Sequence, residues 1–227
     1  KWLRLMYLYP SRISPRLLDL MNERETICRY LDIPLQHVNS EVLTKMNRRL
    51  PGFAGGNSMP ADRFIGEIRR RVPGITIRTT LMTGFPGESH AAFGEMAAFV
   101  EAGHVDHLGV FAWSPEPDTE AEKWEAQADD AVAEDRAARL MAIQADHVDR
   151  VNRDRIGTIQ EIVIDSVEKA NDVWMMEGRI MSQAPEVDGV VRMPGTAVPG
   201  DWLHVRLNGC DLYDFEAEGV GVKGGIC

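Results

Sequence analysis

The sequence predicts a parallel α/β region, either an open sheet or part of a barrel, followed by a small five-stranded β-barrel. Up to about residue 128, β-branched apolar segments alternate with segments of helical period, which is typical of parallel βαβ units. After residue 157 the apolar residues recur at every second position in five short segments. A long helix rich in Ala, Arg and acidic residues is expected between the two regions.

Four strands and their helices are expected in the first region. Ser14 and Pro15 form an N-cap with proline at the first helical position. Pro60 is expected to begin an amphipathic helix, and Glu88 the helix after the third strand. The strands are expected at residues 2–9, 29–35, 75–83 and 107–113, the first of them buried. The helices are expected at residues 14–22, 40–49, 60 onward and 88–102, with a glycine-rich loop at 52–57.

The second region has strand period throughout. Turn-forming residues separate its segments, among them Asn208-Gly209. A barrel of this size is a common nucleic-acid or protein-binding module. The five strands are expected at residues 158–167, 173–181, 187–193, 202–207 and 211–216. The expected domains are 1–128, a linking helix 129–156, the barrel 157–217 and a flexible tail 218–227.

Charge is distributed unevenly along the chain, whose formal net charge is −10. Residues 1–115 carry 14 Lys and Arg against 11 Asp and Glu, whereas the barrel, residues 157–217, carries 4 against 11. An acidic surface repels phosphate backbones and attracts basic partners. The apolar runs are far too short to span a bilayer, so no membrane partner is expected.

Three cysteines, Cys28, Cys210 and Cys227, are scattered along the chain and do not form a metal-binding spacing such as C-x₂-C. Few cysteines and no secretion signal favour a reducing, cytoplasmic setting. The chain opens within a strand-like pattern and has no initiator Met. We therefore expect it to be a piece of a longer protein.

A strand, turn and helix at residues 75–89 form the candidate ligand site. Gly84 and Gly87 lie at the carboxyl end of the predicted strand, where α/β proteins place their ligands. Glycine allows a close approach of the backbone to a ligand, but a plain strand-to-helix turn requires it equally. Alternation places Arg78 and Thr80 on one face of the strand.

Several segments, in this order and spacing, resemble radical SAM methylthiotransferases. Tyr30-Leu-Asp-Ile-Pro-Leu-Gln-His37, followed by Met46-Asn-Arg-Arg49, resembles the fourth strand and helix of that family's barrel. The segments 78–88 and 111–119 resemble its fifth and sixth strands, and the long helix and terminal barrel resemble its TRAM domain with the preceding link. The resemblance implies a partial TIM-like radical SAM barrel followed by a TRAM barrel.

Within that family, Leu35-Gln36-His37 and Ala184-Pro-Glu-Val-Asp-Gly189 resemble the branch that methylthiolates an aspartate of small-subunit ribosomal protein twelve. The cofactors implied are S-adenosyl-L-methionine (SAM) and two 4Fe-4S clusters. The family's cluster ligands, three amino-terminal cysteines and a CxxxCxxC loop, do not occur in this chain, so we expect it to be inactive alone. The alternatives are a tRNA methylthiotransferase and a non-catalytic substrate-docking module.

The resemblance implies a cofactor-binding role for residues at the strand ends, with no catalytic residue and no metal ligand in the chain. Arg78 would hold the SAM carboxylate, unless it pairs with Asp32 as a buried ion pair. Gln36 would bond the ribose or methionine part of SAM, whereas His37 is more often structural. The cofactor-binding residues implied are Gln36, Arg78, Thr80, Gly84, Phe111 and Trp113, the last two flanking the adenine unless they pack in the core.

Two partner expectations follow. The acidic barrel favours a basic small-subunit ribosomal protein over tRNA, because neutralising phosphates needs basic side chains. A truncated parallel barrel leaves a strand edge open, which favours self-association through that edge.

Overall fold

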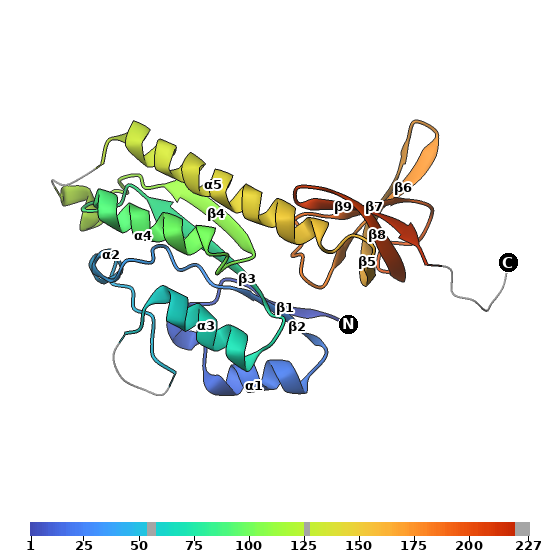
Figure 1. Cartoon of the computed structure of the whole chain (residues 1–227), viewed down its shortest axis with the longest axis horizontal. Coiled ribbons are helices and arrows are strands. Elements are labelled where there is room, and N and C mark those ends of the chain that lie inside the picture. Colours follow the sequence, from blue (N-terminus) through green and yellow to red (C-terminus); the bar gives the residue numbers. More distant parts are fainter. Residues whose placement is uncertain (54–57, 125–127, 221–227) are drawn as a thin grey trace. The chain divides into compact units, whose positions relative to one another are not determined.

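The computed structural model describes residues 1–53, 58–124 and 128–220 (Figure 1). Contacts divide the chain into two compact units, Lys1–His147 and Val148–Cys227, which are described separately below. Parts of the glycine-rich loop at 52–57 and of the tail at 218–227, together with Cys227, lie outside the described residues. Within the described ranges, each helix is too short or too polar to cross a bilayer.

The first unit contains a parallel sheet in the order β1-β2-β3-β4 with helices between the strands. Consecutive strands are therefore neighbours, which is the winding of a β/α barrel and confirms the predicted α/β part. The strands are β1 (Leu3–Leu5), β2 (Ile27–Asp32), β3 (Thr76–Thr83) and β4 (His107–Ala112). The helices are η1 (Pro10–Arg12), α1 (Pro15–Glu23), α2 (Ser40–Lys45), α3 (Ala61–Arg71), α4 (His90–Glu101), η2 (Ala121–Lys123) and the start of α5 (Asp130–Arg153).

One face of this sheet is apolar and packs against the helices. Leu31, Ile77 and Leu108, from three neighbouring strands, lie in a single core with Phe64 of α3 and Phe93 of α4. Strand alternation puts the intervening residues on the other face, which is polar. Asp32 pairs in register with Arg78, Arg78 with His107 and Thr80 with Gly109.

Side-chain caps fix where the helices begin. The Ser14 hydroxyl accepts the Leu17 N–H, as the Ser14-Pro15 pair predicts. Asn39 caps α2, and its carboxamide oxygen accepts the N–H groups of two residues of the first turn. The expected start of α4 at Glu88 is wrong, because Ser89 caps that helix and Glu88 turns inward.

The first strand is shorter and more exposed than its apolar sequence predicts. Tyr7 adopts a left-handed backbone with φ of 56°, which ends the extended segment early. Leu3 is 56% exposed, because β1 is the edge strand of the sheet and has only β2 as a neighbour. The expectation of a buried strand over residues 2–9 is therefore wrong.

The second unit is a closed barrel in the strand order β5-β6-β7-β9-β8, as the change of period predicts. Its core is formed by inward residues of all five strands, among them Ile162, Met176, Val191, Val205 and Phe215. The strands are β5 (Ile159–Ala170), β6 (Val173–Ile180), β7 (Val191–Pro194), β8 (Trp202–Asp211) and β9 (Asp214–Gly219).

One expected turn in the barrel is a β-bulge. Asn208-Gly209 has a turn-forming sequence, but the strand continues through it as β8, and the register shifts between Leu207 and Gly209. The reversal falls instead after Asp211, where Leu212 has a positive φ of 53°. A bulge bends its strand and increases the local twist, which suits the closure of a small barrel.

Candidate functional site

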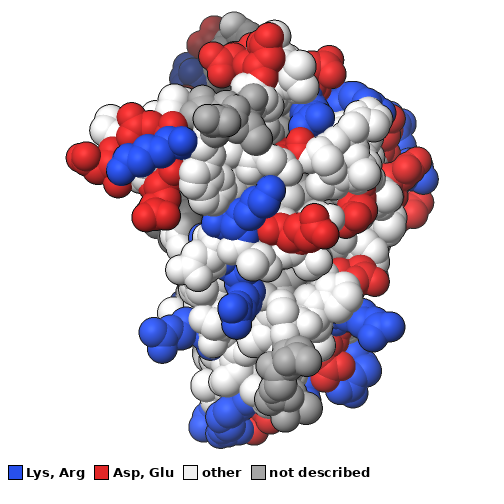
Figure 2. All heavy atoms as spheres, turned by 90° about the vertical axis from the view of Figure 1, so that its left-hand side faces the viewer, with Lys and Arg blue, Asp and Glu red and all other residues white. Residues whose placement is uncertain are grey.

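Gln36, Gly84, Phe111 and Trp113 lie at or just beyond the carboxyl ends of the parallel strands, whereas Arg78 and Thr80 lie farther back, within β3. Figure 2 shows this side of the molecule, on which acidic and basic side chains are interspersed. A surface of mixed sign does not concentrate a polyanion, which requires a field of one sign.

The chain after β2 is held against β3 by an unusual backbone conformation. Gln36 has a positive φ of 72°, and it forms a parallel bridge with Leu81. The Gln36 N–H donates to the Thr80 carbonyl at 2.9 Å, and its carbonyl accepts the Met82 N–H at 2.8 Å. A left-handed non-glycine residue costs about 1–3 kcal/mol and is common at ligand sites.

A buried threonine compensates for the irregular pairing beside Gln36. Pro34 has no N–H to donate to the sheet. The Thr79 hydroxyl accepts the Leu35 N–H at 3.2 Å and donates to the Ile33 carbonyl at 2.8 Å. Because the Thr79 side chain faces the core, this hydroxyl completes the ladder without solvent. The position of Gln36 is therefore fixed by the sheet.

The side-chain oxygen of Gln36 is available to a ligand. Its Oε1 atom is buried, and it has no hydrogen-bond partner within the part of the chain that the structure describes. A buried acceptor without a partner costs about 1–3 kcal/mol, so a bound donor would be stabilised there. The contact of Gln36 with the ribose or methionine part of SAM stays a prediction, and it would use this acceptor.

Arg78 and Thr80 lie together on the polar face of β3, as alternation predicts. A Cβ atom built on Gly109 of β4 would lie 3.7 Å from Arg78 Nη2 and 3.8 Å from Thr80 Oγ1. The guanidinium and the hydroxyl therefore flank the same strip of bare backbone. Phe111 follows on the same strand, opposite Met82 in register, and its side chain is 42% exposed.

Gly84 and Trp113 contact other parts of the first unit. Gly84 has a φ of 76°, and a Cβ atom there would lie 2.4 Å from the Ala133 Cβ atom of α5. Helix packing therefore explains this glycine without a ligand. Trp113 packs edge-on against Phe85, with ring centroids 6.3 Å apart, in a small cluster with Val42.

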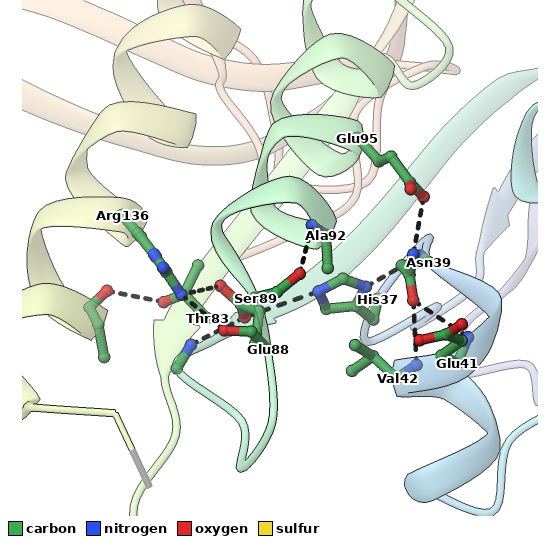
Figure 3. Close-up of polar contacts among 12 residues, drawn as sticks. His37, Asn39, Glu41, Val42, Thr83, Glu88, Ser89, Ala92, Glu95 and Arg136 are labelled. Carbon is green, nitrogen blue, oxygen red and sulfur yellow. Dashed lines mark hydrogen bonds and ion pairs between the residues drawn. The ribbon is translucent and has the colours of Figure 1, made fainter. Parts of the chain in front are cut away.

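Beneath this edge, Glu88 connects three segments through a fully buried carboxylate (Figure 3). Arg136 Nη1 of α5 donates to Oε1 at 2.6 Å, and the Gly84 N–H donates to Oε2 at 2.9 Å. His37 Nε2 lies 3.6 Å from Oε2. The carboxylate thus joins the loop after β2, the turn after β3 and helix α5.

The tautomer of His37 follows from its other contact. Its Nδ1 atom accepts the Asn39 N–H at 3.0 Å, so the proton of a neutral ring sits on Nε2, facing Glu88 (Figure 3). His37 is fully buried, which agrees with the structural reading of this residue. Asn39 in turn caps α2 and donates from Nδ2 to Glu95 at 3.0 Å.

Arg48 of the segment 46–49 supports the same loop. Its Nη1 atom donates to the Pro34 carbonyl at 2.6 Å, and its guanidinium stacks over the Tyr9 ring. Partial burial lowers the pKa of Arg48 from its ordinary value. The side chain therefore anchors the segment that precedes Gln36.

Two residues that sequence reasoning missed contribute to this edge. Met82 continues the alternation of Arg78 and Thr80, so the period of two already indicated its face. Glu88 had no comparable signal, because its side-chain partners, His37 and Arg136, lie far away in the sequence. Two hollows, of about 330 and 210 Å³, lie against the helices α2, α3 and α4, and none of the predicted site residues is among the described residues that line them.

Comparison with known proteins identifies the second region and finds relatives of nearly the whole chain. Residues 156–220 match the TRAM domain family. Over 96% of its length the chain is 38% identical to the ribosomal protein uS12 methylthiotransferase RimO of Syntrophotalea carbinolica. The chain is a RimO-like sequence. The RimO proteins of Desulfotalea psychrophila and Syntrophus aciditrophicus are 35% and 36% identical over 98% and 96% of the chain.

The chain spans about half the length of these RimO proteins: 47%, 49% and 47%, respectively. Among solved structures, the radical S-adenosylmethionine methyltransferase TsrM of Kitasatospora setae aligns with a TM-score of 0.37 and 22% identity. That alignment covers 48% of this chain and 20% of TsrM, too weak a likeness to bear on the fold. The RimO-like character therefore rests on the sequence match and the TRAM domain.

Proposed function

We propose that this chain is the carboxyl-terminal part of a radical SAM methylthiotransferase that modifies an aspartate of ribosomal protein uS12. The similarity to RimO proteins over nearly the whole chain is the observation that supports this most strongly. The polar face of the sheet around Gln36 and Arg78 would bind SAM, and the TRAM domain would dock the substrate protein. The setting proposed is the reducing cytoplasm.

The residues present suit SAM but not an iron–sulfur cluster. Gln36 offers a buried acceptor without a partner, and Arg78 offers planar donors suited to a carboxylate. SAM would supply the methyl group and a carbon radical. A 4Fe-4S cluster requires grouped thiolates, whereas Cys28 lies in β2 of the first unit and Cys210 in β8 of the second. Among residues 1–53, 58–124 and 128–220, no three His, Cys, Asp or Glu side chains are grouped to hold a metal.

SAM is therefore expected to bind this chain only weakly, with a Kd of about 1 mM or higher. In an NMR titration, SAM should shift the Gln36 side-chain amide and the Gly109 backbone amide. The Gln183 side-chain amide of the TRAM domain is an internal control and should not move. Arg78→Lys should weaken the response, because lysine keeps the charge but loses the planar pair of donors. A tight complex, or equal shifts at Gln183, would contradict the proposed site.

The TRAM domain's basic residues are already occupied, which favours a protein partner over tRNA. Arg192 contacts Glu177 and Asp214, and Arg179 contacts Asp165. The two other basic side chains, Lys169 and Arg206, bond to Asp172 and to the Gly157 carbonyl. The surplus charge is carboxylate, so phosphate neutralisation would have to break existing ion pairs. A basic ribosomal protein is the better electrostatic match.

Binding of uS12 and tRNA to the full chain tests this. By fluorescence anisotropy we expect uS12 to bind at least about tenfold more tightly than tRNA. The affinity for uS12 should fall when the salt concentration is raised to about 0.15 M. Reversal of two exposed carboxylates, Glu161→Lys and Glu218→Lys, should weaken uS12 binding and strengthen tRNA binding. Tighter binding of tRNA by the unmodified chain would instead favour a tRNA methylthiotransferase.

The edge strand β1 supports a proposal of self-association. Its backbone groups on the side away from β2 can pair with a strand of a second chain. Sedimentation velocity of the chain alone, run before the binding experiments, should show a concentration-dependent dimer. A monomer at all concentrations would exclude the proposed pairing.

A further inference from the structure

The strands β5 and β6 form a hairpin that stands out from the rest of the TRAM domain (Figure 1). Their pairing continues without a break from the pair formed by Ser166 and Glu177 to the pair formed by Ala170 and Val173. Asn171 and Asp172 form the turn, with φ values of 47° and 64°, as in a two-residue hairpin loop. The tip of the hairpin is therefore a defined structural element.

This tip exposes two large apolar side chains. Trp174 and Val173 are 48% and 51% exposed. Met176 and Ile180, on the same face of β6 as Trp174, are buried in the barrel core. Trp174 therefore continues the inward apolar stripe beyond the point where the barrel covers it. Exposed tryptophan at a protruding tip is typical of interface anchors.

The surroundings of the tip indicate what it would bind. Glu168 is exposed on the neighbouring strand and lies opposite Met175, so alternation puts it on the face of Val173. Lys169, which lies opposite Trp174, is paired with Asp172 at 2.9 Å. The nearby cation is thus neutralised, while a carboxylate remains for a positive partner. An exposed indole can also stack on nucleic-acid bases, but that mode relies on a basic groove along the phosphates. The acidic TRAM domain favours a polypeptide that carries apolar and basic residues.

We propose that Trp174 and Val173, at the tip of the β5–β6 hairpin, anchor a basic protein surface. The inference rests on the proposed function and adds the point of contact. In this arrangement the partner contacts both faces of the tip. The indole buries apolar surface of the partner on one face, and on the other Val173 and Glu168 face its apolar and basic side chains. Charge then sets the rate of encounter, and the tryptophan sets the lifetime of the complex.

Binding of uS12 to Trp174→Ala in the full chain is the test. We expect the Kd to rise at least about tenfold, mainly through faster dissociation. Trp174→Phe should recover part of the affinity, because a ring is retained. The matched control is Ile159→Ala, which removes an apolar side chain that is 50% exposed at the other end of β5 and should leave the Kd within about twofold. Unchanged thermal unfolding would show that both variants are folded.

The outcomes separate the two proposals. If the unmodified chain binds uS12 and Trp174→Ala binds it equally well, the anchor is wrong and the proposed function stands. Equal losses in Trp174→Ala and Ile159→Ala would also overturn the anchor, since the effect would not be local. If the unmodified chain does not bind uS12, the proposed function itself fails. Tighter binding of polyuridylate than of uS12, lost in Trp174→Ala, would make the hairpin an RNA contact.

Discussion

Glu88→Ala is expected to lower the free energy of unfolding of the first unit by about 3–5 kcal/mol. The carboxylate is fully buried and is bonded to Arg136 at 2.6 Å and to the Gly84 N–H at 2.9 Å. Removing it leaves a largely buried guanidinium without its counter-charge and a buried N–H without an acceptor. His37 Nε2, 3.6 Å away, would also lose the oxygen that it faces.

Urea unfolding followed by tryptophan fluorescence measures this effect, because Trp113 and Trp124 pack around Phe85 near the same turn. Glu95→Ala is the matched control. Glu95 is an exposed glutamate on α4 that accepts one hydrogen bond from Asn39, so its loss should cost at most about 1 kcal/mol (Figure 3). Glu88→Gln should fall between the two, since the amide keeps an acceptor but loses the charge. Equal destabilisation by Glu88→Ala and Glu95→Ala would show that the buried network contributes little.

The same residue shows why sequence reasoning predicted the site only in part. Periodicity assigns a residue to a face, so it placed Arg78 and Thr80 together and could have added Met82. It cannot show that Glu88 turns inward, because a glutamate after Pro86-Gly87 has the sequence of an acidic helix start. The contacts that bury it come from separate elements.

The fold was predictable because each unit has a consistent hydrophobic period. The predictions were wrong where the local sequence is compatible with two structures. Asn208-Gly209 suits both a turn and a bulge, and closure of the barrel selects the bulge. The extended pattern of residues 2–9 stops at Tyr7, whose left-handed backbone has no marker such as glycine.

Gly189→Ala is expected to destabilise the TRAM domain by about 3 kcal/mol, the upper end of the usual cost of overpacking. A Cβ atom on Gly189 would lie 1.9 Å from the Tyr213 carbonyl oxygen and 2.4 Å from its carbon. These are backbone atoms, so no change of rotamer can relieve the clash. The glycine of the segment 184–189 is therefore explained by the close approach of two backbone segments of this chain, independently of any substrate.

The clash would separate β7 from β9, since Val190, which lies between Gly189 and β7, forms two hydrogen bonds to β9. The Phe215 N–H donates to the Val190 carbonyl at 2.8 Å, and the Val190 N–H donates to Asp214 Oδ1 at 3.0 Å. Hydrogen exchange of the amides of β7 and β9 should therefore accelerate, by about 100-fold for each 2.7 kcal/mol lost. Gly219→Ala is the control, because among the described residues its Cβ atom would meet only Met193, at an ordinary 3.7 Å. Equal protection in the two variants would mean that the loop before β7 can move aside, and the close approach would then not explain this glycine.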